Sequence, residues 1–463
     1  MNQDTICALA TANGMGAIGI IRISGKDAFN ITNRIFKGNN LENTDSHTVH
    51  YGFVKDDKET IDEVMVSVFH APKTFTTENS VEISFHGSPH IAKKILEVLI
   101  KNGARMAKAG EFTQRAFLNG RIDLSQAESI ADLIASENEA ARKVALNQLK
   151  GGISQEISIL RTELLNFTSL IELELDFAEE DVEFADRTAL KNLIQNLKSK
   201  IQSLLDSFQY GNAIKNGVDV AIIGKPNAGK STLLNALLKE ERAIVSEIAG
   251  TTRDTIEEIL HIKGTAFRFI DTAGIRETTD AIEEIGVKRA KEKIASAKIL
   301  LYLYDEFDST AEEVIRFVKE FWREDLEVIL VHNKIDLNDG YFENELDKKL
   351  EVELFPDFTT QIIGISAKDQ TGIDAIKQIL IEYIESLKSE ENNVVITNQR
   401  HFEALQKSLD AVNRVEEAVS QNIYTELLAF ELRSALDHLG EISGEFTNDE
   451  VLGNIFSKFC IGK

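Results

Sequence analysis

VDVAIIGKPNAGKSTLLNALL, residues 218–238, is the stretch that decides the fold of the chain. Its first six residues, which are apolar apart from Asp219, predict a buried strand, and its last eight residues predict a helix. Between them, residues 224–231 match G-x-x-x-x-G-K-[ST], a loop whose backbone N–H groups and following helix N-terminus surround a chain of phosphates. A Gly-Lys turn without function is the alternative, and the flanking strand and helix speak against it. The expected phosphate-contacting residues are Asn227, Ala228, Gly229, Lys230, Ser231 and Thr232.

The loop lysine and two later segments predict the chemistry at the phosphates. Lys230 neutralises charge on the terminal phosphates, which makes it a candidate catalytic residue. DTAG at 271–274 follows the short strand 266–270, so a carboxylate can hold Mg²⁺ through water and a glycine lets a backbone N–H approach the γ-phosphate. A Thr hydroxyl of GTTRD at 250–254 can complete the Mg²⁺ shell opposite Ser231. These segments add the expected nucleotide contacts Asp271, Thr272, Ala273 and Gly274.

The base is predicted by a quartet that follows another buried strand, because VILVH at 328–332 runs into NKID at 333–336. The Asp336 carboxylate can accept from both the N1–H and the exocyclic amine of guanine, and adenine cannot donate that pair. Unpaired buried polar groups reject the wrong base by roughly 10⁴-fold. SAK at 366–368 follows a further strand, and the four motifs in this order resemble the translation-factor class of GTPases. The expected base-contacting residues are Asn333, Lys334, Asp336, Ser366, Ala367 and Lys368.

Three residues bear on how hydrolysis is assisted. Ile275 stands where small signalling GTPases place a water-orienting glutamine, and an aliphatic side chain cannot orient water. Glu283, in the acidic segment 280–284, is the candidate for that role; the alternative is a solvated loop carboxylate, which spacing alone favours. Asn227 offers a carbonyl oxygen to a monovalent cation, whose charge would replace that of an arginine finger.

Composition limits the classes of protein to which the chain can belong. The length of 463 residues is enough for about three domains. The net charge of −25 argues against a generic polyanion binder. Two cysteines, Cys7 and Cys460, suit a reducing cytosol, so we expect a cytoplasmic protein without a disulfide framework. Neither a signal peptide nor a membrane-spanning apolar run is expected.

Hydrophobic patterning predicts an N-terminal α/β domain, a helical domain and a P-loop GTPase domain with a doubly wound sheet. Strands are expected at 17–23, 64–69 and 81–85, and a helix at 91–101. Pro-free segments with apolar residues at three- and four-residue spacing predict helices within 122–213 and 399–439, so the GTPase domain is inserted into the helical one. The expected boundaries are 1–118 for the α/β domain, 119–216 and 386–463 for the two helical parts, and 217–385 for the GTPase domain.

Segments outside the GTPase motifs resemble a known family. The chain opens with DTICALAT at 4–11 and GIIRISG at 19–25, carries GEFTQRAFLN at 110–119, and ends with GEFTNDEVLGNIFSKFCIGK at 444–463. Together with the inserted GTPase, these segments resemble the MnmE (TrmE) family of tRNA wobble-uridine modification GTPases over essentially the whole chain. The FCIGK terminus on a chain with a central P-loop is the most specific of these features.

The resemblance implies a reaction, its cofactors and its partners. The family binds GTP with Mg²⁺ and K⁺, and it uses a one-carbon donor, 5-formyl- or 5,10-methylene-tetrahydrofolate. With MnmG (GidA), a flavoprotein that uses NADH, it forms a heterotetramer that acts on tRNA. The complex adds an aminomethyl or carboxymethylaminomethyl group to C5 of uridine 34. The family forms a homodimer through its N-terminal region, and its GTPase domains also meet across the nucleotides.

The resemblance also implies site residues, carried over one by one. The folate residues of the family match Arg22, Glu82, Arg121 and Lys463. Several relatives have Lys at the position of Arg121, so the positive charge is the same but the hydrogen-bonding geometry of the side chain differs. The Mg²⁺ ligands match Ser231 and Thr252, and the K⁺ ligands match Asn227 and the backbone of Ser246, Ile248 and Thr251. The water-orienting residue matches Glu283. The nucleotide contacts extend over Ser246, Glu247, Ile248, Ala249, Gly250, Thr251 and Thr252.

The terminal cysteine and the overall function each keep an alternative. Cys460 is either a chemical residue of the modification reaction or a buried packing residue beside Phe456 and Phe459. Prenylation at this cysteine fits Gly462 and Lys463 poorly. The chain is predicted to be a GTPase whose hydrolysis cycle organises a tRNA-modifying complex. The rival is a GTPase switch of ribosome assembly, which would usually carry a basic RNA-binding module, and none is evident in this sequence.

Overall fold

The structure is a computed structural model, and it describes residues 4–176, 187–239, 257–271, 295–337, 344–356, 358, 360–388, 394–421, 425–446 and 449–462. Contacts between residues divide the chain into two compact units, which are described separately. The first unit comprises Met1–Ala135, Ala145–Ser199 and Glu403–Lys463, and the second comprises Ser136–Val144 and Lys200–Phe402. Three helices have residues in both units: α5 (Glu139–Leu149), α7 (Arg187–Asn216) and α13 (Gln399–Ser420).

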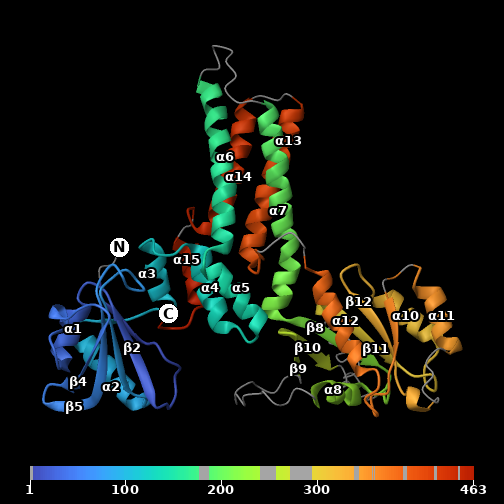
Figure 1. Cartoon of the computed structure of the whole chain (residues 1–463), viewed down its shortest axis with the longest axis horizontal. Coiled ribbons are helices and arrows are strands. Elements are labelled where there is room, and N and C mark those ends of the chain that lie inside the picture. Colours follow the sequence, from blue (N-terminus) through green and yellow to red (C-terminus); the bar gives the residue numbers. More distant parts are fainter. Residues whose placement is uncertain are drawn as a thin grey trace, which may run out of the picture. The chain divides into compact units, whose positions relative to one another are not determined.

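The first unit begins with a seven-stranded sheet of order β3-β4-β5-β6-β2-β1-β7, drawn in blue in Figure 1. Every neighbouring pair is antiparallel except β1 and β7, which are parallel. The strands are β1 (Ile6–Leu9), β2 (Ile18–Ser24), β3 (Phe36–Lys37), β4 (Thr48–Asp56), β5 (Glu59–Phe69), β6 (Ser80–His86) and β7 (Arg105–Met106). Two helices, α1 (Ala28–Ile35) and α2 (Pro89–Lys101), pack on one face of the sheet, and the single-turn helix η1 (Leu41–Asn43) follows β3.

Side chains alternate between the two faces along the strands, and at β1 both faces are covered, because Ile6 and Ala8 are buried with Phe112 on the face opposite α1 and α2. In β5, Val64, Val66 and Val68 are buried beneath the helices, whereas the intervening Met65 is 45% exposed. The predicted mixed α/β character of this part of the chain is therefore confirmed. The strand expected at 17–23 is displaced by one residue from β2, the other two expected strands lie within β5 and β6, and the expected helix lies within α2.

Helices make up the rest of the first unit. They are α3 (Glu111–Leu118), α4 (Leu124–Ala135), α6 (Gly152–Asp176), α14 (Thr425–Ser443) and α15 (Asp449–Ser457). Although far apart in sequence, α6 and α14 lie side by side (Figure 1), and Glu172 of α6 pairs with Arg433 of α14 at 2.5 Å. Ile157, Leu160 and Leu164 of α6 are buried, which is the three- and four-residue spacing of a helix face turned toward a core.

The second unit contains a six-stranded sheet of order β13-β12-β11-β8-β10-β9. The strands are β8 (Val218–Gly224), β9 (Glu257–Ile262), β10 (Thr265–Asp271), β11 (Ile299–Tyr304), β12 (Glu327–His332) and β13 (Thr360–Gly364). The pair β9 and β10 forms an antiparallel hairpin, and all other neighbours are parallel. Lys263 and Gly264, which both have positive φ, form the two-residue turn of that hairpin, so the turn matches the twist of its strands.

Helices cover both faces of this sheet. Val218, Val220 and Ile222 of β8 are buried with α8 (Lys230–Lys239) and α12 (Ile373–Ser386). Between them, Ala221 is buried on the other face with α10 (Ala311–Phe321) and α11 (Glu345–Leu354). Because both faces are covered, every residue of β11 is buried, as a parallel strand in such a sheet requires.

The strand order locates the place where a ligand can enter the second unit. β8 lies between β10 and β11. The chain adds β9 and β10 on one side of β8 and then β11, β12 and β13 on the other side, so the strand order reverses at β8. Ligands of open α/β sheets bind beyond the carboxyl ends of the strands at such a switch point. The loops after β8, β12 and β13 all emerge at that edge, and the single-turn helix η4 (Ile335–Leu337) follows β12. Among the described helices, none combines the length and apolar character needed to cross a membrane.

Candidate nucleotide and cofactor sites

The phosphate loop after β8 is tightly turned and is held from inside by its own lysine. Lys230 Nζ donates to the carbonyl oxygens of Gly224 at 2.7 Å and Lys225 at 2.9 Å. Asn227 adopts a φ of +63°, which asparagine tolerates better than most residues do. Gly229 has a φ of +98°, and a Cβ there would lie 2.1 Å from Asn333 Nδ2. Glycine is therefore required at this position both by the positive φ and by the close approach of the Asn333 side chain.

Asn333 joins the phosphate loop to both segments of the predicted guanine loop. Its Nδ2 donates to the carbonyl oxygen of Ala228 at 2.7 Å, and its Oδ1 accepts from the backbone N–H of Ala367 at 3.0 Å. The Asn333 side chain is buried, with only 4% of the residue exposed. An amide can satisfy a carbonyl and an N–H at once, which no aliphatic residue can do. The structure thus brings together motifs that are about a hundred residues apart in the chain.

Asp336 is oriented by the second guanine segment. Ser366 Oγ donates to Asp336 Oδ1 at 2.8 Å and also accepts from the backbone N–H of Asp369 at 3.1 Å. The backbones of Ser366 and Thr371 exchange two hydrogen bonds, which close the segment that contains Lys368. A carboxylate fixed through one oxygen can present its other oxygen to a donor such as a guanine edge.

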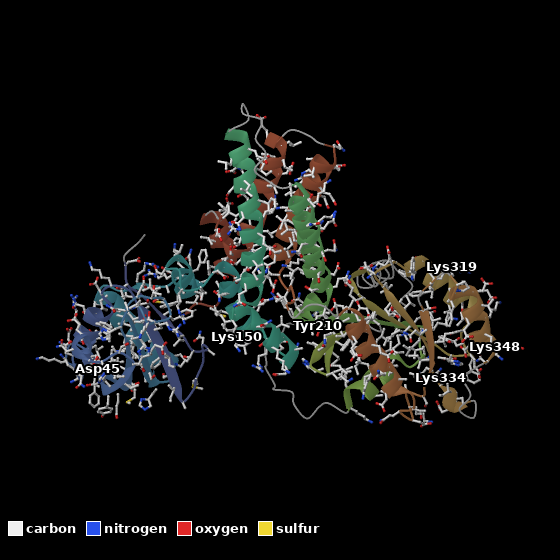
Figure 2. The ribbon with its side chains drawn as sticks, turned by 45° about the horizontal axis from the view of Figure 1, so that its top comes forward. Asp45, Lys150, Tyr210, Lys319, Lys334 and Lys348 are labelled. Atoms are coloured by element: carbon white, nitrogen blue, oxygen red, sulfur yellow. The ribbon has the colours of Figure 1, made fainter. Side chains whose placement is uncertain are left out.

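Two acidic residues that the sequence motifs do not include hold the lysines of this site. Asp305, whose side chain is 3% exposed, pairs with Lys334 Nζ at 2.7 Å (Lys334 is labelled in Figure 2). Its other oxygen accepts from the backbone N–H groups of Phe307 and Asp308, so Asp305 also shapes the loop after β11. Glu313, at the start of α10, pairs with Lys225 Nζ of the phosphate loop at 2.7 Å.

A buried polar group lies directly beneath the guanine loop. His332 precedes Asn333, and its Nδ1 lies 2.8 Å from Asp347 Oδ2 in α11. Tyr304 donates its hydroxyl to the other oxygen of Asp347 at 2.5 Å and stacks on the His332 ring. Burial, together with the adjacent Asp347 carboxylate, raises the pKa of Tyr304 well above its usual value, so the phenol stays protonated and remains a donor.

Several predicted residues lie outside the part of the chain that the structure describes. Asp271 ends β10 as the last residue of that strand, which places its backbone at the carboxyl edge of the sheet. The predictions for the remaining hydrolysis and cation residues concern Ser246, Glu247, Ile248, Ala249, Gly250, Thr251, Thr252, Thr272, Ala273, Gly274 and Glu283, all outside the described residues. Lys463 is outside them as well.

In the first unit, the structure gathers three of the four residues matched to a folate site. Arg22 on β2 and Glu82 on β6 are cross-strand partners, and their side chains pair at 2.8 Å. The Arg22 guanidinium lies 5.4 Å from the centre of the Phe75 ring, and the Arg121 guanidinium lies 5.0 Å from the same ring. Phe75 is therefore the side chain that brings the two arginines together, and no motif in the sequence indicated it.

The carboxy-terminal tail runs along the same unit, and Cys460 is exposed there. Its carbonyl oxygen accepts from the Gly110 N–H at 3.4 Å, and Ile461 forms an isolated bridge with Ala109. Phe456 and Phe459 are buried in a cluster that includes Leu124 and does not include the cysteine. The interpretation of Cys460 as a buried packing residue is therefore wrong, because the two phenylalanines are buried in the cluster while Cys460 is exposed outside it.

Comparison with known proteins bears on what these sites belong to. A family model described as the MnmE helical domain matches residues 124–460, and one described as the GTP-binding protein TrmE N-terminus matches residues 5–121. The chain belongs to the MnmE (TrmE) family. The tRNA modification GTPase MnmE of Cytophaga hutchinsonii is 51% identical over 464 residues, which cover 100% of this chain and 98% of that protein.

A second relative matches this MnmE-family chain over its full length, and solved structures match part of it. The tRNA modification GTPase MnmE of Flavobacterium johnsoniae is 49% identical over 470 residues, covering 100% of both chains. Among solved structures, an Era variant of Aquifex aeolicus bound to GDP and AlF₄⁻ is 29% identical at a TM-score of 0.30. That likeness covers 42% of this chain and 66% of the Era chain.

Proposed function

We propose that this chain hydrolyses GTP within a complex that modifies tRNA. The observation that carries the proposal is the joined base and phosphate site, in which Asn333 ties the P-loop to the second guanine segment while Ser366 orients Asp336. Membership of the MnmE family, whose similar members are named tRNA modification GTPases, supports the tRNA part. In this account the sheet of the second unit is a doubly wound nucleotide-binding sheet, and the GTPase domain spans 217–385.

At the phosphates, the chain's own residues would bind and neutralise the nucleotide. Lys230 and the loop N–H groups would contact the terminal phosphates, and the hydroxyls of Ser231 and Thr252 would hold Mg²⁺. Asn227 and the backbone of Ser246, Ile248 and Thr251 would hold K⁺. Hydroxyl and carbonyl oxygens are the donors that such hard cations prefer, so the residue types fit both ions. The metal ions supply charge stabilisation at the phosphates, and Glu283 orients the attacking water.

In the first unit, the residues around Phe75 fit a folate coenzyme. A flat ring flanked by two guanidinium groups suits the stacked and charged parts of such a molecule, and Glu82 suits the donor edge of a pterin. Arg22, Glu82, Arg121 and Lys463 would hold it, and the bound coenzyme supplies the one-carbon unit. Residues 1–118 would bind this coenzyme and form the homodimer, while 119–216 and 386–463 form the helical domain that carries Cys460 as a chemical residue.

We further propose the reaction and its partners by family analogy. The chain acts in the cytoplasm with the MnmG flavoprotein, as a heterotetramer, and adds an aminomethyl or carboxymethylaminomethyl group to C5 of uridine 34 in tRNA. GTP hydrolysis organises this complex through a conformational cycle and does not itself form the new bond.

Asp336→Asn tests the guanine assignment directly. The variant should bind GTP more weakly and xanthosine triphosphate more tightly, because the new amide donates to the xanthine 2-oxygen that a carboxylate would face oxygen to oxygen. Asp374→Asn is the matched control, since Asp374 lies in the first turn of α12 with its side chain 95% exposed. Unchanged GTP affinity in the Asp336 variant would show that this carboxylate does not read the base.

A further inference from the structure

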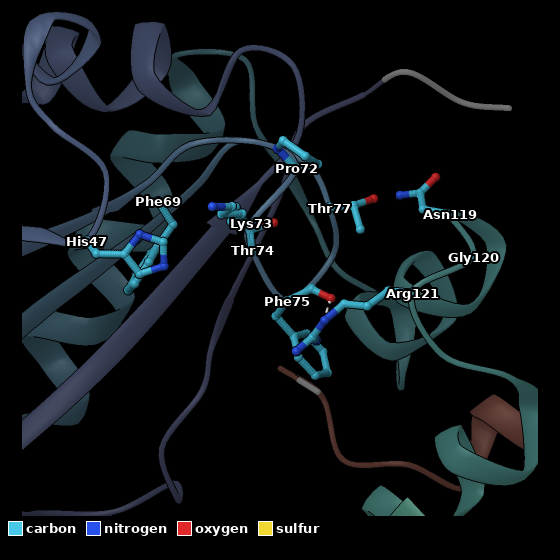
Figure 3. Close-up of a pocket in the computed structure, with 10 residues that line it drawn as sticks. All are labelled: His47, Phe69, Pro72, Lys73, Thr74, Phe75, Thr77, Asn119, Gly120 and Arg121. Atoms are coloured by element: carbon cyan, nitrogen blue, oxygen red, sulfur yellow. Dashed lines mark hydrogen bonds between the residues drawn. The ribbon is translucent and has the colours of Figure 1, made fainter. Parts of the chain in front are cut away.

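A pocket of about 470 Å³ lies beside the Phe75 ring, within the first 121 residues of the chain. Its size falls within the roughly 300–1,000 Å³ of small-molecule sites. Figure 3 shows His47 and Phe69 on one side of it and Phe75 and Arg121 on another. The ten lining residues are His47, Phe69, Pro72, Lys73, Thr74, Phe75, Thr77, Asn119, Gly120 and Arg121.

The charge of this pocket is opposite to that of the whole protein. Of the 463 residues, 76 are Asp or Glu and the net charge is −25, yet none of the ten lining residues is acidic. Lys73 and Arg121 are cationic, and His47 becomes so when protonated. Hydroxyl and amide groups of Thr74, Thr77 and Asn119 complete a lining that suits an anionic ligand.

The cationic side chains are placed so that they can receive a ligand. Arg121 donates from NH1 to the carbonyl oxygen of Phe75 at 2.9 Å, which is its one acceptor in the described part of the chain, so its other N–H donors are available. Lys73 is exposed and forms no ion pair with any described residue. His47 is held by Ser46 Oγ at 2.8 Å from its Nδ1 and by an edge contact with Phe69.

Phe75 connects this pocket to the residues of the proposed folate site. Two guanidinium groups lie over the Phe75 ring: that of Arg22, which pairs with Glu82, and that of Arg121, which lines the pocket. A coenzyme that stacks at Phe75 with its carboxylate end toward Arg121 therefore has the pocket directly ahead of it. The lining of the pocket suits a ligand that continues past Arg121 and carries more than one negative charge.

We propose that this pocket holds the polyglutamate tail of a folate coenzyme, in which each added γ-linked glutamate contributes one carboxylate. The inference rests on the proposed folate function and adds to it a preference for the polyglutamylated form. Each ion pair between a tail carboxylate and an exposed cation such as Lys73 contributes up to roughly a five-fold gain in affinity. Because the monoglutamyl coenzyme already places its own carboxylate end at Arg121, the added pair with Lys73 should make triglutamyl coenzyme bind up to about five-fold more tightly.

The test measures binding of mono- and triglutamyl 5-formyltetrahydrofolate to the full-length chain by calorimetric titration at low ionic strength. Lys73→Gln should reduce the preference for the triglutamyl form by about two- to five-fold while leaving monoglutamyl affinity unchanged. The matched control is Lys58→Gln, an exposed lysine in the turn at the other end of the β4–β5 hairpin, which should keep the full preference. Added salt should weaken the preference in the unmodified protein, because the ion pairs are exposed.

The outcomes separate this inference from the proposed function. Equal affinity for both forms would overturn the tail site and leave folate binding intact, whereas no binding of either form would overturn the folate function itself. A Lys73 variant that keeps the full preference for the triglutamyl form would show that this pocket does not hold the tail. If Lys73→Gln instead weakened tRNA binding without changing the folate preference, the pocket would be an RNA-phosphate contact and the proposal would be wrong.

Discussion

Asp305→Asn should weaken nucleotide binding although the residue belongs to no nucleotide motif. In the structure, one Asp305 oxygen accepts from the N–H groups of Phe307 and Asp308 and the other pairs with Lys334 Nζ. An asparagine keeps an oxygen for the two backbone donors, so the loop after β11 keeps its shape. Its NH₂ group, however, faces the Lys334 ammonium with a donor instead of an acceptor. The substitution therefore removes support from the guanine loop without opening a cavity.

The size of the effect follows from burial. A hydrogen bond to a charged group contributes roughly 1.5–3 kcal/mol. The Asp305 side chain is 3% exposed, but that of Lys334 is 32% exposed, so water partly replaces the lost partner and the lower end of the range applies. A loss of about 1.5 kcal/mol corresponds to a roughly ten-fold rise in Kd. GTP and GDP should be affected alike, because the base is the same in both.

The assay is an equilibrium titration with a fluorescent GDP analogue, accompanied by kcat at saturating GTP and by the unfolding temperature. We expect Kd to rise about ten-fold with kcat unchanged, because the interaction is the same in the ground and transition states. Asp325→Asn, which breaks a half-exposed pair with Lys298, is the control and should change Kd less than two-fold. The loss in a variant that combines Asp305→Asn with Lys334→Met should be smaller than the sum of the two single losses, because both substitutions break the same ion pair. Unchanged Kd in a folded Asp305 variant would refute the reasoning.

Three further predictions concern hydrolysis and the tail. Hydrolysis should be much faster in KCl than in NaCl at equal ionic strength, and Asn227→Gly, which keeps the positive φ at this position, should remove the difference; equal rates in the unmodified protein would exclude a selective K⁺ site. Glu283→Ala should lower kcat by about 10²-fold or more with GTP affinity retained, and a matching loss of affinity would make the residue structural. Cys460→Ser should abolish tRNA modification but not GTP hydrolysis, whereas near-normal modification would deny the thiol a chemical role.

Local patterns were enough to predict β8, β10 and β12, the strands of the second unit that precede predicted nucleotide motifs. Each motif follows a short apolar strand, and parallel strands place their carboxyl ends at one edge, so order along the chain implied nearness in space. The roles of Asp305 and Asp347 could not be read in the same way. Each acts on a residue 15 to 29 positions away, through a contact that exists only after β11, β12 and α11 have packed together.

Fewer of the strands and contacts of the first unit could be predicted from the sequence, for a similar reason. Strands β1, β3 and β7 are only two to four residues long, which is too short for an alternating pattern to stand out. Phe75 lies in a loop, where it packs against the cluster that contains Ile6 and Phe112 and where Arg22 and Arg121 converge on its ring, and no local pattern shows these contacts. The exposure of Cys460 depends on the packing of Phe456 and Phe459 against Leu124 and Ala127 of α4, residues that are more than 300 positions away in the sequence.

The most direct test of the central claim is mass spectrometry of tRNA nucleosides from cells that lack this protein. We expect the C5 aminomethyl and carboxymethylaminomethyl groups of wobble uridine to disappear, the unaltered gene to restore them, and a gene encoding Lys230→Ala to leave them absent. Wobble uridines that remain fully modified without the protein would contradict the account and would favour a GTPase switch of another kind, such as one acting in ribosome assembly.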